Sequence, residues 1–174
     1  GKLVLQTHKF FGSMADCYAG TRGTDIAKIL EEEARKRENI TIMTDSVVVG
    51  VFADGKAGIY QPQEERYLLL SFAGVIVATG ARERSLVFPG NDLPGVFGAG
   101  AFQTLVNRDL VKSSERVLIV GCGNVGLIAA YHALQAGIDV VALIDIAPKV
   151  SGYKVHGDKI KRMGVPIYLS HTLV

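Results

Sequence analysis

Apolar and polar positions follow two different rhythms along this chain. Between Thr24 and Arg37 the apolar residues fall at helical spacing, and on the other face acidic residues precede basic residues by four positions. Three β-rich runs follow, at 41–53, 56–60 and 67–72. Asp54-Gly55 separates the first two runs and suits the positive φ angles of a two-residue hairpin turn. The pattern predicts a one-sided surface helix and then a small antiparallel β-meander.

The next apolar run, at 75–78, shows no alternation. Such a run is typical of a strand buried on both faces of a sheet, and a Thr-Gly pair at 79–80 ends it. Residues 81–115 are interpreted as a connector between domains, because they carry Pro-Gly turns at 89–90 and 94–95. Within this connector the sequence predicts a helix at 101–110.

Beyond residue 115 strands and helices alternate regularly. Apolar strands are predicted at 117–120, 140–144 and 166–170, with helices at 127–136 and 153–163. Gly137 is a natural end for the first of these helices. Because such alternation is typical of βαβ units, this part of the chain predicts an α/β, Rossmann-like fold with a parallel sheet.

A glycine pattern lies at the turn between the strand 117–120 and the helix that follows. Gly121, Gly123 and Gly126 fit GxGxxG, directly after a strand and at the start of a helix. The first glycine permits the tight turn, the second lets the backbone approach a pyrophosphate, and the third lets helix and strand pack closely. A purely structural glycine-rich turn is the alternative, but the surrounding elements favour a dinucleotide site, with the phosphates at the helix N-terminus.

Asp145 ends the second strand of this unit. There its carboxylate can accept a hydrogen bond from the adenosine ribose 2′-hydroxyl, whereas a 2′-phosphate would be repelled. The position favours NAD(H) over NADP(H). Two alternatives stay open: Asp145 only caps the strand, or Lys149 serves a phosphate.

Composition excludes several classes of function. Charge is nearly balanced at +2, and no basic stripe interleaved with aromatic residues is present, so nucleic acid is not expected as a partner. The most apolar stretch, at 67–81, is too short to span a membrane. Cys17 and Cys122 form no CxxC pair, which favours a reducing cytoplasm. The first residue and the last apolar run suggest an internal fragment of a larger protein.

The Val-Ile-Val-Ala-Thr-Gly run at 75–80, followed some forty residues later by GxGxxG, resembles the pyridine nucleotide-disulfide oxidoreductase superfamily. Within it, the segments at 78–84 and 88–96 look most like amine and amino-acid dehydrogenase subunits related to sarcosine oxidase alpha chains. The resemblance implies a two-dinucleotide-domain flavoprotein fold, with residues 1–98 as a partial FAD-binding domain that includes the meander. Residues 99–174 would be a partial NAD(P)-binding Rossmann domain.

The resemblance also implies which residues bind the two cofactors, FAD and NAD. The flavin side would use Val48, Thr79, Gly80 and Ala81. The NAD(H) side would use Gly121, Gly123, Asn124, Val125, Gly126 and Asp145. The sequence departs from the family pattern in two respects, since a first FAD-binding GxGxxG and a CxxC disulfide are both missing. An FAD site therefore cannot be complete within this segment, and direct hydride exchange between NAD(H) and flavin is favoured over a dithiol relay.

Other reactive residues carry little signal. Cys122 sits at a helix N-terminus, but its place inside GxG makes a small backbone-lining role the better interpretation. The four histidines show no metal-ligand spacing, so no metal is expected. Lys9 with the two phenylalanines that follow it is best read as a packed loop.

These observations predict an FAD- and NAD-dependent oxidoreductase with an unidentified small-molecule substrate or electron acceptor and no assignable catalytic acid or base. Two alternatives stay open: a non-catalytic dinucleotide-binding module, and a structural partner in a multi-subunit or oligomeric complex.

Overall fold

The computed structural model describes all 174 residues, which form two compact units. One unit comprises Gly1–Lys28 together with Ala81–Val174, and the other comprises Ile29–Gly80. We call them the nucleotide unit and the meander unit and describe each by itself. No helix in the chain is both long enough and apolar enough to cross a membrane.

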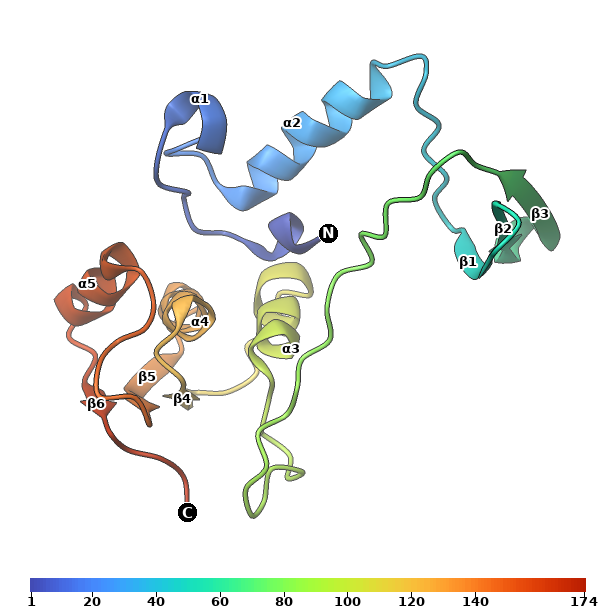
Figure 1. Cartoon of the computed structure of the whole chain (residues 1–174). Coiled ribbons are helices and arrows are strands. Elements are labelled where there is room, and N and C mark those ends of the chain that lie inside the picture. The colour runs from blue at the N-terminus through green and yellow to red at the C-terminus, as the bar shows by residue number, and fades with distance from the viewer. The chain divides into compact units, whose positions relative to one another are not determined.

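The meander unit contains one three-stranded antiparallel sheet in the order β1-β2-β3 (Figure 1). Its strands are β1 (Val47–Phe52), β2 (Lys56–Gln61) and β3 (Arg66–Ser71). Gly55 has a φ of +75° in the β1–β2 turn, as the Asp-Gly pair predicts. A single 3-10 turn, η2 (Pro62–Glu64), joins β2 to β3. The predicted meander is confirmed, although β1 begins six residues later than the β-rich run.

The prediction of a buried strand at 75–78 is wrong. This segment belongs to no strand, and the side chains of Ile76 and Val77 are 93% and 75% exposed. An apolar run forms a strand only when another strand satisfies its backbone groups. β1 to β3 pair among themselves and β4 to β6 form a separate sheet, so no strand of this chain pairs with the segment.

The nucleotide unit contains a parallel sheet in the order β4-β5-β6, made of β4 (Arg116–Val120), β5 (Asp139–Asp145) and β6 (Ile167–Leu169). α4 (Asn124–Gln135) connects β4 to β5, and α5 (Lys154–Arg162) connects β5 to β6. The βαβ pattern that the sequence predicts is confirmed. Leu127 and Ala130 from α4, Leu143 from β5 and Ile160 from α5 lie almost fully buried in the core of this unit.

The remaining elements of the nucleotide unit come from the N-terminal residues and from the segment that precedes β4. η1 (Lys2–Leu5) and α1 (Met14–Cys17) precede α2 (Gly23–Arg35), which begins in this unit and ends in the other. α3 (Ala99–Gln103) continues directly into the π-helical turn η3 (Thr104–Arg108), close to the helix predicted at 101–110. η1 and η3 pack together, as do α3 and α4, so the N-terminal residues lie against the helices of the nucleotide unit.

Candidate dinucleotide site

The turn from β4 to α4 is shaped by its glycines. Gly121 has a φ of +107°, a conformation that side chains rarely adopt. A Cβ added at Gly126 would lie 2.0 Å from the carbonyl oxygen of Gly121, so any side chain there would collide with backbone. The Gly121 amide donates to the Ile144 carbonyl at 2.7 Å, which fastens the turn to β5. The tight turn and the close helix–strand approach, two of the three roles expected for these glycines, are both observed.

The N-terminus of α4 is open to a ligand. Gly123 is the N-cap residue and provides no side chain to accept the first helical amides. The first intrahelical bond returns to it from Leu127, so the amides of Asn124, Val125 and Gly126 have no intrahelical acceptor. A Cβ at Gly123 would meet only the Ser151 hydroxyl, at 3.7 Å. Unpaired amides and the positive end of the helix dipole together favour a phosphate at this point.

Asp145 joins the end of β5 to the glycine turn. Its carboxylate accepts a hydrogen bond from the Cys122 amide at 2.6 Å and another from the Ala147 amide at 2.9 Å. The capping role weighed from the sequence is therefore real. A carboxylate has about four acceptor positions, so two backbone bonds leave capacity for a ribose hydroxyl. Asp145 is only half-buried, and this remaining capacity is accessible.

Cys122 is fully buried beneath this carboxylate. Burial, with the negative charge of Asp145, raises the pKa of its thiol. A raised pKa keeps the thiol protonated at neutral pH, and a protonated thiol is a poor nucleophile. Cys122 therefore lines the turn and takes no chemical part there.

A second loop, which the sequence reasoning missed, packs against the glycine turn. The Asn124 side-chain oxygen accepts a hydrogen bond from the Tyr153 amide at 2.7 Å, and the Gly152 amide donates to the Cys122 carbonyl at 3.0 Å. A Cβ at Gly152 would lie 2.6 Å from the Leu127 side chain. The available signal was Gly152 itself, just before the predicted helix at 153–163. Asn124, expected to contact the cofactor, thus also holds this loop.

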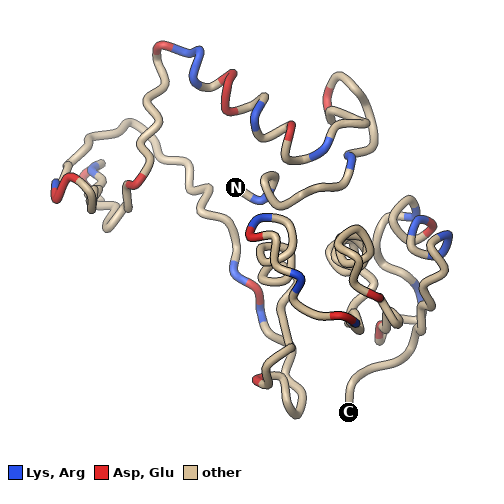
Figure 2. The backbone as a smooth tube through the Cα atoms, turned by 180° about the vertical axis from the view of Figure 1, so that it is seen from behind, with Lys and Arg blue, Asp and Glu red and all other residues tan.

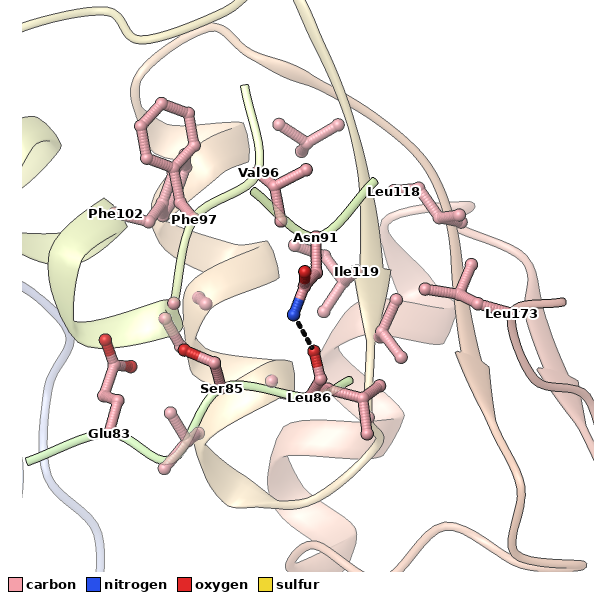
Figure 3. Close-up of a pocket in the computed structure, with 18 of the residues that line it drawn as sticks. Glu83, Ser85, Leu86, Asn91, Val96, Phe97, Phe102, Leu118, Ile119 and Leu173 are labelled. Atoms are coloured by element: carbon pink, nitrogen blue, oxygen red, sulfur yellow. Dashed lines mark hydrogen bonds between the residues drawn. The ribbon is translucent and has the colours of Figure 1, made fainter. Parts of the chain in front are cut away.

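A cavity of about 570 Å³ lies beside the turn (Figure 3). One wall is β4 with Gly121, Gly123 and Val125, and the other is the segment 83–99. Its lining is mainly apolar and includes Phe97 and Phe102, which suits a flat organic ring more than a charged group. The sequence predicts only a connector here, because a wall built from turns has no periodic signal.

The connector is held by its own polar contacts. Figure 3 shows the Asn91 side-chain amide donating to the Leu86 carbonyl, at 2.9 Å. At one end of the cavity, the Glu83 carboxylate accepts from the first amides of α3, those of Gly100 and Ala101. These contacts fix the segment 83–100 as one wall of the cavity.

The residues expected on the flavin side are all exposed. Val48 lies on β1 and its side chain is 58% exposed. Thr79, Gly80 and Ala81 lie outside any helix or strand and are exposed, with Gly80 at a φ of +83°. Their assignment to flavin binding rests on the resemblance alone.

Comparison with known proteins identifies relatives over most of the chain. The profile of the family described as pyridine nucleotide-disulphide oxidoreductase matches residues 4–173. Sarcosine oxidase subunit alpha of Rhizobium meliloti (strain 1021) is 30% identical in a 141-residue alignment that covers 74% of this chain and 14% of that protein. An NADH oxidase of Methanocaldococcus jannaschii is 28% identical in a 131-residue alignment that covers 72% of this chain and 29% of that protein.

Among solved structures, T. acidophilum thioredoxin reductase superposes with a TM-score of 0.66 at 20% identity. The match covers 97% of this chain and 52% of the reductase, and at this identity it supports the fold alone. The expected two-dinucleotide-domain flavoprotein fold is confirmed. The match spans 14% of the length of the sarcosine oxidase subunit and 29% of the length of the NADH oxidase.

Proposed function

The chain belongs to the pyridine nucleotide-disulphide oxidoreductase family, and from that premise we propose that it is part of an FAD-dependent oxidoreductase that binds NAD(H) and exchanges a hydride with flavin. The observation that carries this proposal is the open N-terminus of α4. Three amides there have no intrahelical acceptor and Gly123 has no side chain to cover them, while Asp145 accepts from the Cys122 amide in the same glycine turn.

The residues of the nucleotide unit fit a dinucleotide. The pyrophosphate would lie at the amides of Asn124 and Val125, where Gly123 leaves the backbone accessible, and Gly121 and Gly126 would shape the turn beneath it. Asp145 would accept from the adenosine ribose, which favours NAD(H), with Lys149 as the competing partner for a 2′-phosphate. When bound, the nicotinamide supplies the hydride chemistry, while this chain binds, orients and excludes water.

The proposed flavin side draws on Val48, Thr79, Gly80 and Ala81. One GxGxxG is present in this sequence, and we assign it to NAD(H), so these four residues would supply only part of an FAD site. We accordingly propose residues 1–98 as the FAD-binding part and 99–174 as the NAD-binding part. No residue of this chain is proposed as a catalytic acid or base.

A subunit role is the second candidate. The sarcosine oxidase relative is itself named a subunit, which favours a chain that works alongside others. In that case the chain would hold a dinucleotide for a partner that carries the substrate site. Both cysteines are free, and we propose the reducing cytoplasm as its compartment.

Anaerobic titration of the full-length protein with NADH separates the two candidates. A yellow protein whose flavin absorbance bleaches on adding NADH supports the oxidoreductase, and a colourless protein that still binds NADH supports the binding subunit. A full-length protein that contains no flavin and does not bind NADH contradicts both candidate functions.

The choice of nucleotide is tested by titrating NADH and NADPH in parallel. Asp145→Ala is expected to weaken NADH binding about tenfold, as for one lost hydrogen bond to a charged acceptor. Asp139→Ala, at the other end of β5, is the matched control and should leave affinity unchanged. Tighter binding of NADPH than of NADH to the unchanged protein would overturn the assignment of Asp145.

A further inference from the structure

Four consecutive residues near the N-terminus are tied by side-chain hydrogen bonds to the helices of the nucleotide unit. The partners lie on α3, η3 and α4. The pairs are Leu5 with Asn107 at 2.7 Å, Gln6 with Gln103 at 3.3 Å, Thr7 with Gln135 at 3.2 Å and His8 with His132 at 3.4 Å. We call residues 5–8 the clamped segment.

Asn107 fixes the protonation of the histidine pair. Its side-chain nitrogen donates to the Leu5 carbonyl, which can only accept, so the orientation of the amide is set. The same nitrogen lies 2.9 Å from His132 Nδ1, which must therefore accept. The proton of neutral His132 then sits on Nε2 and is donated to His8 Nδ1.

In this arrangement neither imidazole has a free lone pair. A proton added to His132 must go to Nδ1, where it faces the Asn107 amide. A proton added to His8 must go to Nδ1, where it faces the Nε2 proton of His132. Either event places two donors against each other. Turning the Asn107 amide to relieve the conflict would break its bond to Leu5.

We propose that this pair is a proton-controlled latch: neutral His8 and His132 hold residues 5–8 against α3, η3 and α4, and protonation of either histidine releases the segment. His132 is fully buried and His8 nearly so. A cavity of about 370 Å³, lined in part by Thr7, Asn107 and His132, borders the latch.

The charges around the pair oppose protonation. The titratable or charged groups on the surrounding elements are Lys2 on η1, Lys9 and Arg22 on the N-terminal segment, Asp25 at the start of α2, Arg108 on η3, Asp109 directly after it, Lys112 beyond, Tyr131 on α4, and Lys154, His156, Asp158, Lys159, Lys161 and Arg162 on α5. Figure 2 colours the acidic and basic residues among them along the backbone. Asp109 is already paired with Arg108 at 2.7 Å, and Asp158 is paired with Lys154. The neighbours that act on the two imidazoles are Lys159 and the imidazole of His156, which disfavour a further positive charge.

Burial lowers the pKa of both His8 and His132 to about 4 from an ordinary 6.5, assisted by His156 and Lys159 at His8 and by His8 and Lys159 at His132. A lowered pKa means that the released segment takes up protons more readily than the clamped one. Release therefore becomes easier as pH falls from about 6.5 towards 4. At about pH 5 His8, which leaves with the segment, favours release by ~30-fold. His132 stays on α4 and adds at most another ~30-fold, so that both together favour release by up to ~10³-fold.

Hydrogen exchange of the full chain, corrected for intrinsic rates, measures this release directly. The reporters are the amides of Gln6, bonded to the Leu3 carbonyl, and Thr24, bonded to the Gln6 carbonyl. Between about pH 7.5 and 5 their opening constant should rise by between ~30-fold and ~10³-fold. The Gly121 amide in the glycine turn is the internal control and should open no more readily.

Two variants and one spectroscopic measurement complete the test. His8→Asn keeps an acceptor near the Nδ1 position but cannot titrate, so the pH-dependent rise should fall to ~30-fold or less. His171→Asn changes an exposed histidine outside the latch and should leave the rise unchanged. If His8→Asn does not fold, the ¹⁵N spectrum of the imidazoles decides, because it should show His132 protonated on Nε2 at neutral pH. Opening that does not depend on pH, or His132 protonated on Nδ1, would overturn the latch.

Discussion

Removing the Asp145 carboxylate tests whether this residue holds the glycine turn in place. In Asp145→Ala the Cys122 and Ala147 amides both lose their acceptor. The Cys122 amide belongs to a residue with no exposed surface, so water cannot easily replace the lost partner. We therefore expect the variant to be less stable even with no nucleotide present.

The expected magnitude follows from these two bonds. Hydrogen bonds to charged groups contribute about 1.5–3 kcal/mol each, and because Asp145 is half-exposed we take the low end, about 3 kcal/mol for both. For a chain of this size, 1 kcal/mol shifts the melting temperature by about 2–4 °C. Asp145→Ala should thus melt about 6–12 °C below the unchanged protein.

Differential scanning calorimetry of the nucleotide-free protein measures the shift, and Asp139→Ala is its control. Asp139 is a carboxylate at the other end of the same strand, exposed and paired with Arg116 at 3.3 Å. Exposed pairs contribute about 0–1 kcal/mol, so this variant should shift the melting temperature by under about 4 °C. Equal shifts in the two variants would refute the fastening role of Asp145.

The glycines and the connector provide further tests. Gly126→Ala should unfold the nucleotide unit, detected as loss of its calorimetric transition, because the new Cβ would collide with the Gly121 carbonyl. Gly123→Ala should keep its stability to within about 1 kcal/mol in urea unfolding, because space remains around the new Cβ. It should nevertheless weaken NADH binding in titrations, because the Cβ blocks the approach of the phosphate. Equal losses of stability in Gly126→Ala and Gly123→Ala would contradict this distinction. Glu83→Ala should lower stability by about 1 kcal/mol, as for a lost helix cap, without changing NADH affinity, and no change in urea unfolding would contradict the capping of α3.

Sequence patterns predicted the βαβ unit well because its signals are local. Gly121, Gly126 and Gly137 mark the turn, the close packing and the end of α4 within one short stretch, and each is observed where it was expected. Asp145 was placed correctly at the end of β5. Its bond to the Cys122 amide was not foreseen, because it joins residues 23 positions apart through the turn geometry.

The features that the sequence did not predict correctly have a different cause. The apolar run at 75–78 reads as a buried strand from composition, but pairing depends on a neighbour that its own sequence cannot supply. The histidine latch was missed for a related reason. His8 and His132 are 124 residues apart, and only the packing of the N-terminal segment on α4 brings them together. Long-range contacts of this kind leave no periodic signal.

The edge position of β4 affects how this chain behaves at high concentration. β4 pairs with β5 on one side only, and four of its five residues are apolar. An apolar strand with an unpaired edge is a template for pairing with another chain. Arg116 is the single charged residue along it, and it stands at the very start. Preparations of this chain should therefore self-associate through this edge. Leu118→Lys should reduce the self-association, because a charged side chain on an edge strand disfavours pairing with another chain.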